Sequence, residues 1–175
     1  MEQWTEREVR AAIGATPCCD VLDGEEQEPT GPHRWFAEAL AEIVTVVAMQ
    51  RMSETDRSPH PDWKQYAPEL ARHADEWITT ARLPPGTTLA RWYRENQPLL
   101  QQEPSLRERN RVVAVALLPL FEERPDCWKA IDWLDYDMSG TFAGYLENWH
   151  ARVPEKLRPA VRQVAREFGI EIEDG

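Results

Sequence analysis

Prolines divide this sequence into short segments, and this division limits the fold more than any other feature. The chain has 14 prolines in 175 residues, and a proline ends or kinks a helix because it lacks the backbone N–H and restricts the preceding residue. Between the prolines, apolar residues recur at the three- and four-residue spacing of amphipathic helices. The sequence therefore predicts an all-α fold, with residues 1–175 forming a single compact domain of about eight short helices.

Capping residues and proline stops place these helices along the chain. The longest carries apolar residues on most of its faces, so we expect it to lie at the centre of the core. Ser105 with Glu108 predicts a capping box at one helix start, and Pro119 is expected to kink the helix that contains it. The expected helices span about 6–13, 32–53, 61–81 with an interruption at Pro68, 87 or 88 to 96 with one more turn after Pro98, 105–121, 125–134, 142 or 145 to 153, and 155 or 159 to 168.

The net charge of the chain limits the classes of partner that it is expected to bind. The chain has 31 acidic and 20 basic residues, a formal net charge of −11, and part of the excess lies in an acidic, turn-rich loop expected at 15–31. Nucleic-acid backbones and anionic membranes are bound through Lys and Arg, so we expect neither as a partner. The charge favours a cation or a basic protein partner. Glu38 and Glu42 interrupt the longest apolar run and exclude a membrane span.

The cysteines are typical of a protein with free thiols, and the tryptophans are typical of a core anchored by aromatic side chains. Cys18, Cys19 and Cys127 are an odd number and include an adjacent pair, which predicts free thiols and a cytoplasmic location, in keeping with the missing signal-peptide pattern. The chain has eight tryptophans. We expect most of them to anchor the core with their indole N–H groups satisfied, with an aromatic ligand-binding box as the alternative.

One stretch alternates oxygen-bearing side chains at Asp135, Asp137 and Ser139 and continues with Gly140, Thr141 and Phe142. It resembles the calcium loop of the EF-hand family over about a dozen residues, within a helix–loop–helix expected at 125–153. Calcium takes about six to eight oxygen ligands, which alternate residues of a tight loop can supply. The resemblance implies calcium as the cofactor. Its implied ligands are Asp135, Asp137, Ser139, the carbonyl of Thr141, and Glu147.

The stretch departs from the family pattern at one position. The family has a bidentate glutamate at the twelfth residue of the loop. That position is Leu146 here, and Glu147 follows one residue later, so a glutamate closes the loop only if the loop is one residue longer. The alternative interpretation is a polar connection between helices, in which Ser139 or Thr141 caps the next helix.

A second pair of residues suggests a different metal. Glu147 and His150 form Glu-x-x-His on one helix face, a pattern that carboxylate-bridged di-iron bundles use twice, and this chain has it once. The sequence shows no G-x-S-x-G, Rossmann, phosphate-loop or H-E-x-x-H signature, so it favours a non-enzymatic role. We therefore predict a helical protein-interaction or regulatory domain that responds to calcium. The alternatives are a calcium buffer or sensor, and an enzyme or di-iron-like site at Glu147 and His150.

Overall fold

The computed structural model describes residues 31–54, 61–135 and 140–173. These residues form seven α-helices and two 3-10 helices, and no strand occurs within those ranges. The all-α prediction is confirmed. The helix expected at 6–13 and all but the last residue of the acidic loop at 15–31 lie outside the described residues.

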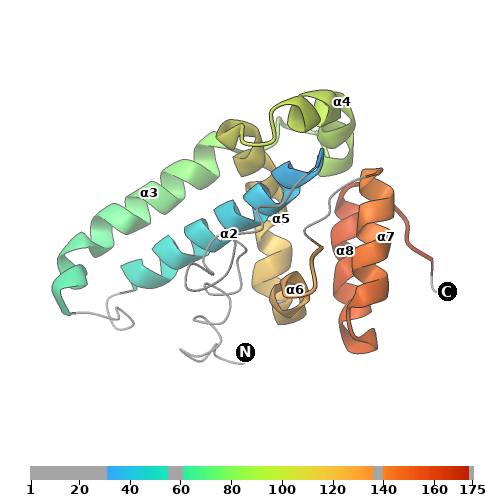
Figure 1. Ribbon diagram of the computed structural model, residues 1–175. Helices are drawn as coiled ribbons and strands as arrows, with labels where there is room; N and C mark the ends of the chain where they lie inside the picture. The colour runs from blue at the N-terminus through green and yellow to red at the C-terminus, as the bar shows by residue number, and fades with distance from the viewer. Residues whose placement is uncertain (1–30, 55–60, 136–139, 174–175) are drawn as a thin grey trace.

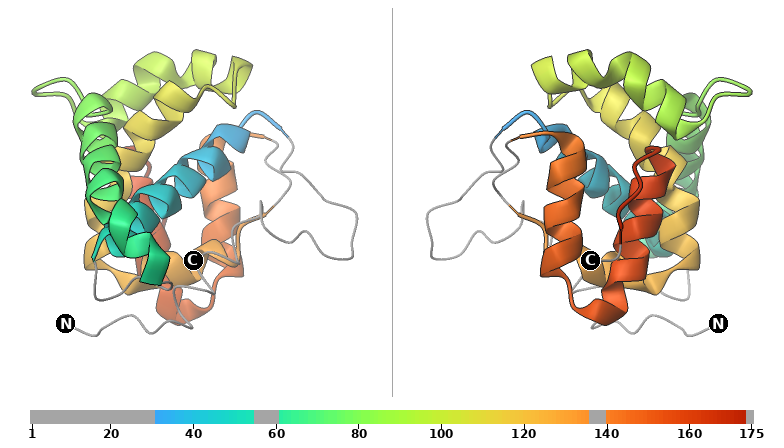
Figure 2. Two further views of the ribbon diagram at one scale, coloured as in Figure 1. Left: turned by 90° about the vertical axis from the view of Figure 1, so that its left-hand side faces the viewer. Right: turned by 90° about the vertical axis from the view of Figure 1, so that its right-hand side faces the viewer.

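The elements follow one another closely along the chain (Figure 1). Their bounds are α2 (Arg34–Ser53), η2 (Pro61–Tyr66), α3 (Ala67–Thr80), α4 (Leu89–Gln102), α5 (Arg107–Glu123), α6 (Pro125–Ile131), α7 (Phe142–Arg152), η3 (Glu155–Leu157) and α8 (Arg158–Glu167). The helix α2 packs against both α5 and α3, and α3 runs beside it along one arm of the molecule (Figure 1). At the other end α7 and α8 stand side by side, joined by η3 (Figure 2).

The helix α2 is the centre of the core, as its sequence predicts. It is the longest described helix, and it buries seven of its residues, which lie on several of its faces: Trp35, Phe36, Ala39, Leu40, Glu42, Ile43 and Val46. Burying one large apolar side chain contributes about 1.5–3 kcal/mol. The contacts of α2 with α3, α4 and α5 therefore account for much of what holds the helices together.

An aromatic cluster fills the core at the start of α2. Phe142, the first residue of α7, lies at its centre, with ring centroids 4.9 Å from Trp35, 5.3 Å from Tyr93 and 5.0 Å from Phe168. Most pairs are tilted or edge-to-face, the arrangements that the charge distribution of aromatic rings favours. The cluster joins α2, α4, α7 and the residue that follows α8, and so fixes where α7 begins.

Several tryptophans anchor the core, as predicted. Trp35, Trp92, Trp128 and Trp149 are buried, whereas Trp133 is 42% exposed. The indole N–H of Trp128 donates to the carbonyl of Phe121, and that of Trp149 donates to the carbonyl of Ala130. The indole nitrogen of Trp35 has no hydrogen-bond partner among the described residues, which departs from the expectation.

Several predicted helix boundaries differ from the observed ones. His33 occupies the N-cap of α2, so this helix starts after Pro32. The helix α4 does not end near Asn96 but runs on through Pro98 to Gln102; the further turn expected after Pro98 is present, and it buries Leu100 completely. Ser105 does not cap α5. Leu106 stands at the N-cap, without a side-chain hydrogen bond, and Asn110 Nδ2 donates to the carbonyl of Pro104 instead.

Two further expectations concern the thiols and the membrane. Cys127 is free and fully buried, and burial raises the pKa of its thiol to about 12, so this thiol is inert at neutral pH. Cys18 and Cys19 lie outside the described residues. Among the helices that are described, none combines the length and the apolar character needed to cross a membrane.

Candidate functional site

The residues between α6 and α7, which we call the α6–α7 connection (132–141), carry most of the predicted calcium ligands. The helix α6 ends at Ile131, earlier than expected, and two turn hydrogen bonds follow, from the N–H of Trp133 to the carbonyl of Ala130 and from the N–H of Leu134 to the carbonyl of Ile131. The chain then reaches Asp135. Asp137 and Ser139 lie outside the described residues.

Asp135 is held against α7 through both its side chain and its backbone. Its carboxylate accepts a charge-assisted hydrogen bond from the guanidinium of Arg152 in the last turn of α7. Its carbonyl accepts a hydrogen bond of 3.2 Å from the hydroxyl of Tyr145. Burial, and to a lesser extent the charge of Asp135, raises the pKa of Tyr145. The phenol therefore stays protonated and remains a donor at all physiological pH values.

Gly140, at the other end of the connection, is held by the start of α2. Nε2 of His33 lies 2.9 Å from the carbonyl oxygen of Gly140, and the His33 side chain is fully buried. Burial lowers the pKa of His33, so its imidazole is neutral and must carry its proton on Nε2 to donate this bond. Gly140 has φ +77°, a conformation that glycine adopts without steric cost.

Thr141 caps α7. Its Oγ1 accepts a hydrogen bond of 3.1 Å from the N–H of Gly144, and its carbonyl accepts one of 2.9 Å from the N–H of Tyr145. The capping role that the polar-connection interpretation assigned to Thr141 is therefore present. The carbonyl that the EF-hand resemblance makes a calcium ligand already takes part in the first turn of the helix, although its second lone pair remains available.

The structure brings some of the predicted ligands to the connection and leaves another on the helix surface. Asp135 and Thr141 flank the connection, and both are engaged in protein contacts. Glu147 lies on the exposed face of α7. Within the described residues, no group of three or more His, Cys, Asp or Glu side chains is placed to hold a metal ion. A calcium site would therefore need Asp137 and Ser139 together with a rearrangement at Asp135.

The Glu147–His150 pair lies in a setting that disfavours a metal. His150 is 7% exposed, and its pKa is lowered by burial first and then by the positive charges of Arg162 and Arg158. Two guanidinium groups that oppose a proton on His150 would also repel a metal cation there. This geometry therefore gives no support to the di-iron-like alternative.

Sequence reasoning missed the residues that hold the connection in place: His33, Tyr145 and Arg152. His33 lies 107 residues from Gly140. No local motif signals such a pairing, because it depends on how α2 packs against α7. Arg152 follows Asp135 by 17 residues, and its charge in the last turn of a helix is an ordinary sequence feature that does not predict a particular partner.

Comparisons of the chain with models of protein families, with curated proteins and with solved structures give no match. Any function of the connection must therefore be inferred from the contacts that the structure shows. These contacts include one carboxylate held by an arginine, one capped helix start, and one buried histidine that holds the intervening glycine.

Proposed function

We propose that this chain is a non-enzymatic helical protein-interaction or regulatory domain, and that the α6–α7 connection is its calcium-responsive element. One observation carries the proposal. The connection is fastened to the last turn of α7 through Arg152 and to the start of α2 through His33. An ion bound in the connection would therefore act on two helices, and on the surface they form, rather than on an isolated loop.

Calcium binding at Asp135, Asp137 and Ser139 would compete with Arg152. The Arg152 and Asp135 side chains are 48% and 37% exposed, and an ion pair of this exposure contributes about 0–1 kcal/mol. Displacing the guanidinium therefore costs little compared with the gain from coordinating a divalent cation. A lone loop that must also order itself binds weakly, which favours a dissociation constant on the order of 10⁻⁵ to 10⁻³ M.

Trp133 is the residue through which calcium binding would affect the binding of a protein partner. It lies two positions before Asp135 and is 42% exposed, more than the other tryptophans whose burial the structure describes. Aromatic side chains are enriched where proteins bind each other. A change at Asp135 would alter how Trp133 is presented. A partner with basic residues around an apolar pocket would suit both this indole and the net charge of −11.

Calorimetry and tryptophan fluorescence of chelator-treated protein test the calcium response. We expect one calcium per chain and no comparable heat with magnesium, which demands a more regular octahedral ligand set. Asp135→Asn with Asp137→Asn should abolish the heat, whereas Asp132→Asn, an exposed aspartate of the same connection, should not. Glu147→Gln shows whether this glutamate closes the loop. No heat and no thermal shift at millimolar calcium would refute the calcium-responsive element.

Arg152→Gln gives a sharper test of the competition. Removing the guanidinium takes away one competitor for the Asp135 carboxylate, so calcium affinity should increase, by up to about fivefold for an ion pair of up to about 1 kcal/mol. Arg166→Gln, which removes the same charge from an exposed site on α8, controls for the change in net charge. Equal affinities for both variants would contradict direct competition.

The second candidate, a calcium buffer or sensor without a partner surface, differs in one measurable result. A buffer binds calcium without altering the exposed indole, so the fluorescence of Trp133 would stay constant through the titration. The variant Trp133→Phe assigns the fluorescence change to this residue. Trp133→Ala should also reduce recovery of a binding partner, whereas Tyr66→Ala, which alters a residue 54% exposed on η2, should not.

A further inference from the structure

The residues of η3 and α8 carry a local excess of positive charge, although the chain as a whole has a net charge of −11. From Lys156 to Glu167 the sequence has four basic residues and one acidic residue. Three of the four form what we call the α8 basic surface: Lys156, Arg158 and Arg166. Arg162, the fourth, already takes part in an interaction of its own and is not counted in this surface.

All three side chains of the α8 basic surface reach solvent. Lys156 and Arg166 are exposed, and Arg158 is partly exposed. Arg166 pairs with Glu171 at 3.5 Å, but the two side chains are 55% and 78% exposed, so solvent screens the pair and another carboxylate can replace Glu171. Nε of Arg158 is buried and has no hydrogen-bond partner among the described residues. The α8 basic surface can therefore accept further carboxylates.

The sequence contains a segment of opposite charge, residues 20–28, which we call the acidic segment. It has five carboxylates and no lysine or arginine: Asp20, Asp23, Glu25, Glu26 and Glu28. The segment lies outside the described residues, but its last residue is only three positions before Gly31, where the described structure begins. His33, the N-cap of α2, follows two residues later. The acidic segment is therefore tethered to the start of α2.

The start of α2 lies beside the end of α8. Phe168, the residue that follows α8, has its ring centroid 6.0 Å from those of both Trp35 and Phe36 in the first turn of α2. An extended chain spans about 3.3–3.6 Å per residue, so residue 28 can lie up to about 11 Å from Gly31, and residue 20 up to about 40 Å. The ten residues of α8 measure about 15 Å. The acidic segment is therefore long enough to reach both ends of α8.

We propose that the acidic segment docks on the α8 basic surface of the same chain, through ion pairs with Lys156, Arg158 and Arg166. The tether gives the segment a high effective concentration at this surface, so the contact needs little affinity of its own. Exposed ion pairs are individually weak, so docked and released forms exchange. The docked segment occupies the surface that an acidic peptide of another protein would otherwise bind.

The helix α8 suits the acidic segment better than α4, which also lies beside the start of α2. Tyr93 on α4 has its ring centroid 5.5 Å from that of Trp35, so the segment can reach α4 as well. Residues 89–103, however, contain two arginines and two glutamates, and Arg91 pairs with Glu95 at 3.0 Å. Because α4 has no net positive charge, the charge of α8 decides where the segment docks.

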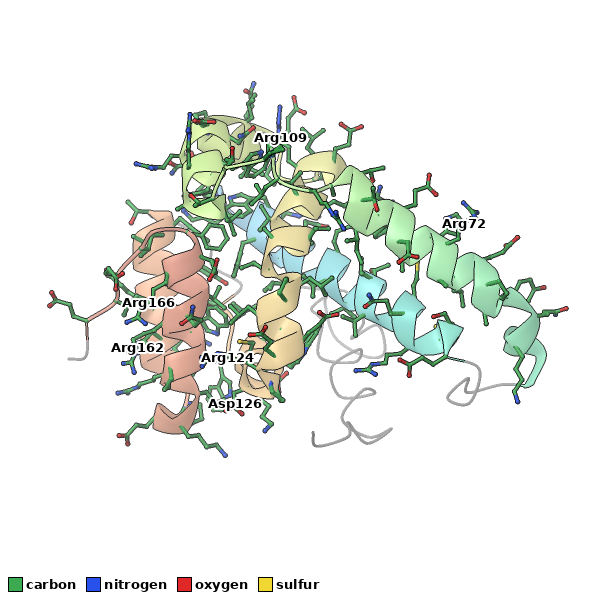
Figure 3. The ribbon with its side chains drawn as sticks, turned by 180° about the vertical axis from the view of Figure 1, so that it is seen from behind. Arg72, Arg109, Arg124, Asp126, Arg162 and Arg166 are labelled. Carbon is green, nitrogen blue, oxygen red and sulfur yellow. The ribbon has the colours of Figure 1, made fainter. Side chains whose placement is uncertain are left out.

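The native cysteines allow this contact to be measured in the full chain. Cys127 is buried, with its pKa raised to about 12, so a thiol-reactive nitroxide labels Cys19 alone once Cys18→Ser removes its neighbour. In chelator and at low salt, the nitroxide should broaden the NMR signals of α8 amides more than those of α3, which lies at the opposite end of the molecule with Arg72 (Figure 3). Salt of about 1 M shortens the Debye length to about 3 Å and should abolish the difference. Equal broadening of α8 and α3, or a difference that this salt leaves unchanged, would overturn the proposal.

Matched variants of the acidic residues test whether charge causes the contact. Glu25→Gln with Glu26→Gln should reduce the broadening at α8. The loss of each ion pair should lower the ratio of docked to released chains by up to about fivefold. Glu122→Gln with Glu123→Gln changes an adjacent, exposed pair at the end of α5 by the same charge and should leave the broadening as it was. Equal effects of the two double variants would contradict docking by the acidic segment.

Variants of the basic residues identify the surface. Arg158→Gln with Arg166→Gln should release the segment, whereas Arg158→Lys with Arg166→Lys keeps both charges and should retain the contact, even if the glutamine variant does not fold. Arg94→Gln on α4 is the control, and an equal loss there would overturn the assignment to α8. Nitroxide-labelled chains mixed with unlabelled, isotope-enriched chains test for a second copy. Undiminished broadening in this mixture would show that the segment docks on another chain and would overturn the intramolecular contact.

Discussion

Nε2 of His33 lies 2.9 Å from the carbonyl oxygen of Gly140, and this bond joins the start of α2 to the start of α7 across 107 residues. The His33 ring also packs near Phe142 and Tyr145, at centroid distances of 5.5 Å and 6.4 Å. His33 therefore holds the connection by one buried hydrogen bond, and its ring packs against the edge of the aromatic cluster. The α6–α7 connection takes its position from the core rather than from its own sequence.

His33→Leu should destabilise the protein. The variant removes the donor and leaves the Gly140 carbonyl without this hydrogen bond, a loss of about 1–3 kcal/mol. His33→Gln keeps an N–H donor on a side chain of similar reach, so it should lose less. Urea unfolding of both variants in chelator measures the difference. Equal losses would show that the ring packing, and not the hydrogen bond, matters at this position.

Stability should fall on acidification through the titration of His33. Burial lowers the pKa of His33 below its ordinary value of 6.5 in the folded state. The unfolded chain then binds more protons at any pH between the two values, so the free energy of unfolding rises with pH in that window. The contribution is complete above about pH 6.5 and is lost as the pH falls toward the lowered pKa.

Urea midpoints measured between about pH 7.5 and pH 5.5 check this dependence. His33→Gln should flatten the profile, because glutamine keeps a donor but does not titrate. His150 also has a lowered pKa and contributes a slope of the same sign, so the double variant with His150→Gln should be flatter still. A profile that His33→Gln leaves unchanged would show that His33 does not cause the acid sensitivity.

The sequence predicts the helices well because their signals are local. The spacing of Phe36, Leu40 and Ile43 marks a buried face of α2, and all three are at most 2% exposed. The other members of the predicted stripe are only partly buried: Val44, Val47 and Met52. Two helix starts fall at threonines that the sequence allows as caps, Thr88 and Thr141, and each accepts a backbone N–H three residues on. These features depend only on neighbours within one or two turns, which the sequence displays directly.

Features that depend on packing are the ones the sequence does not predict. The end expected for α4 near Asn96 is wrong because the helix runs on without a break through Pro98 to Gln102, and the turn after Pro98 buries Leu100. Ser105 has the right chemistry for a cap, yet α5 starts at Arg107. At the candidate site, the alternation at Asp135 is visible in the sequence, whereas its pairing with Arg152 and the role of His33 require the fold.

Thr141→Ala should destabilise the protein by about 0.5–2 kcal/mol, because α7 loses the side chain that caps its first turn. Thr141→Ser keeps the capping oxygen and should cost less. Thr88→Ala removes the corresponding cap of α4, whose hydrogen bond is 3.3 Å compared with 3.1 Å at Thr141. Thermal unfolding compares the two sites. If capping is the cause, both alanine variants lose stability and both serine variants recover it.

Arg111 should contribute more to stability than Arg107, although both pair with Glu42. Their distances to the Glu42 carboxylate are 3.3 Å and 2.9 Å, but their side chains are 25% and 71% exposed. Arg111 also lies over the Trp77 ring, 3.6 Å from its centroid, so it joins α2, α3 and α5. Solvent screens the Arg107 pair and leaves the Arg111 pair stronger despite its longer distance.

Replacing each arginine by methionine keeps the apolar stem and removes the charge. Arg111→Met should cost about 2 kcal/mol, because Glu42 loses its more buried partner and Trp77 loses its cation. Arg107→Met should cost at most about 0.5 kcal/mol. Denaturant unfolding of the two variants gives the comparison. A larger loss for Arg107→Met would mean that distance, and not burial, determines which pair matters.

Gly169→Ala should cost more than Gly86→Ala, although both glycines have positive φ. Gly169 follows α8 with φ +72°, and its N–H and that of Ile170 donate to carbonyls of the last turn, at 2.8 Å and 3.0 Å, so it ends the helix. An added Cβ would lie 3.1 Å from the Cβ of Ala90 on α4, whereas at Gly86, with φ +74°, it would meet nothing within 4 Å.

Gly86→Ala therefore measures the backbone strain alone, about 1–2 kcal/mol for an L-residue in this conformation. Gly169→Ala adds the close contact with Ala90, where both atoms belong to short side chains that cannot rotate away. Ala90→Gly removes the atom that the new methyl meets, so the double variant should recover the difference between the two sites, after correction for the cost of Ala90→Gly alone. Urea unfolding of the four proteins completes the cycle. A coupling energy of zero would show that α4 and the end of α8 shift apart without cost, and that their contact does not fix the position of the C-terminal helix.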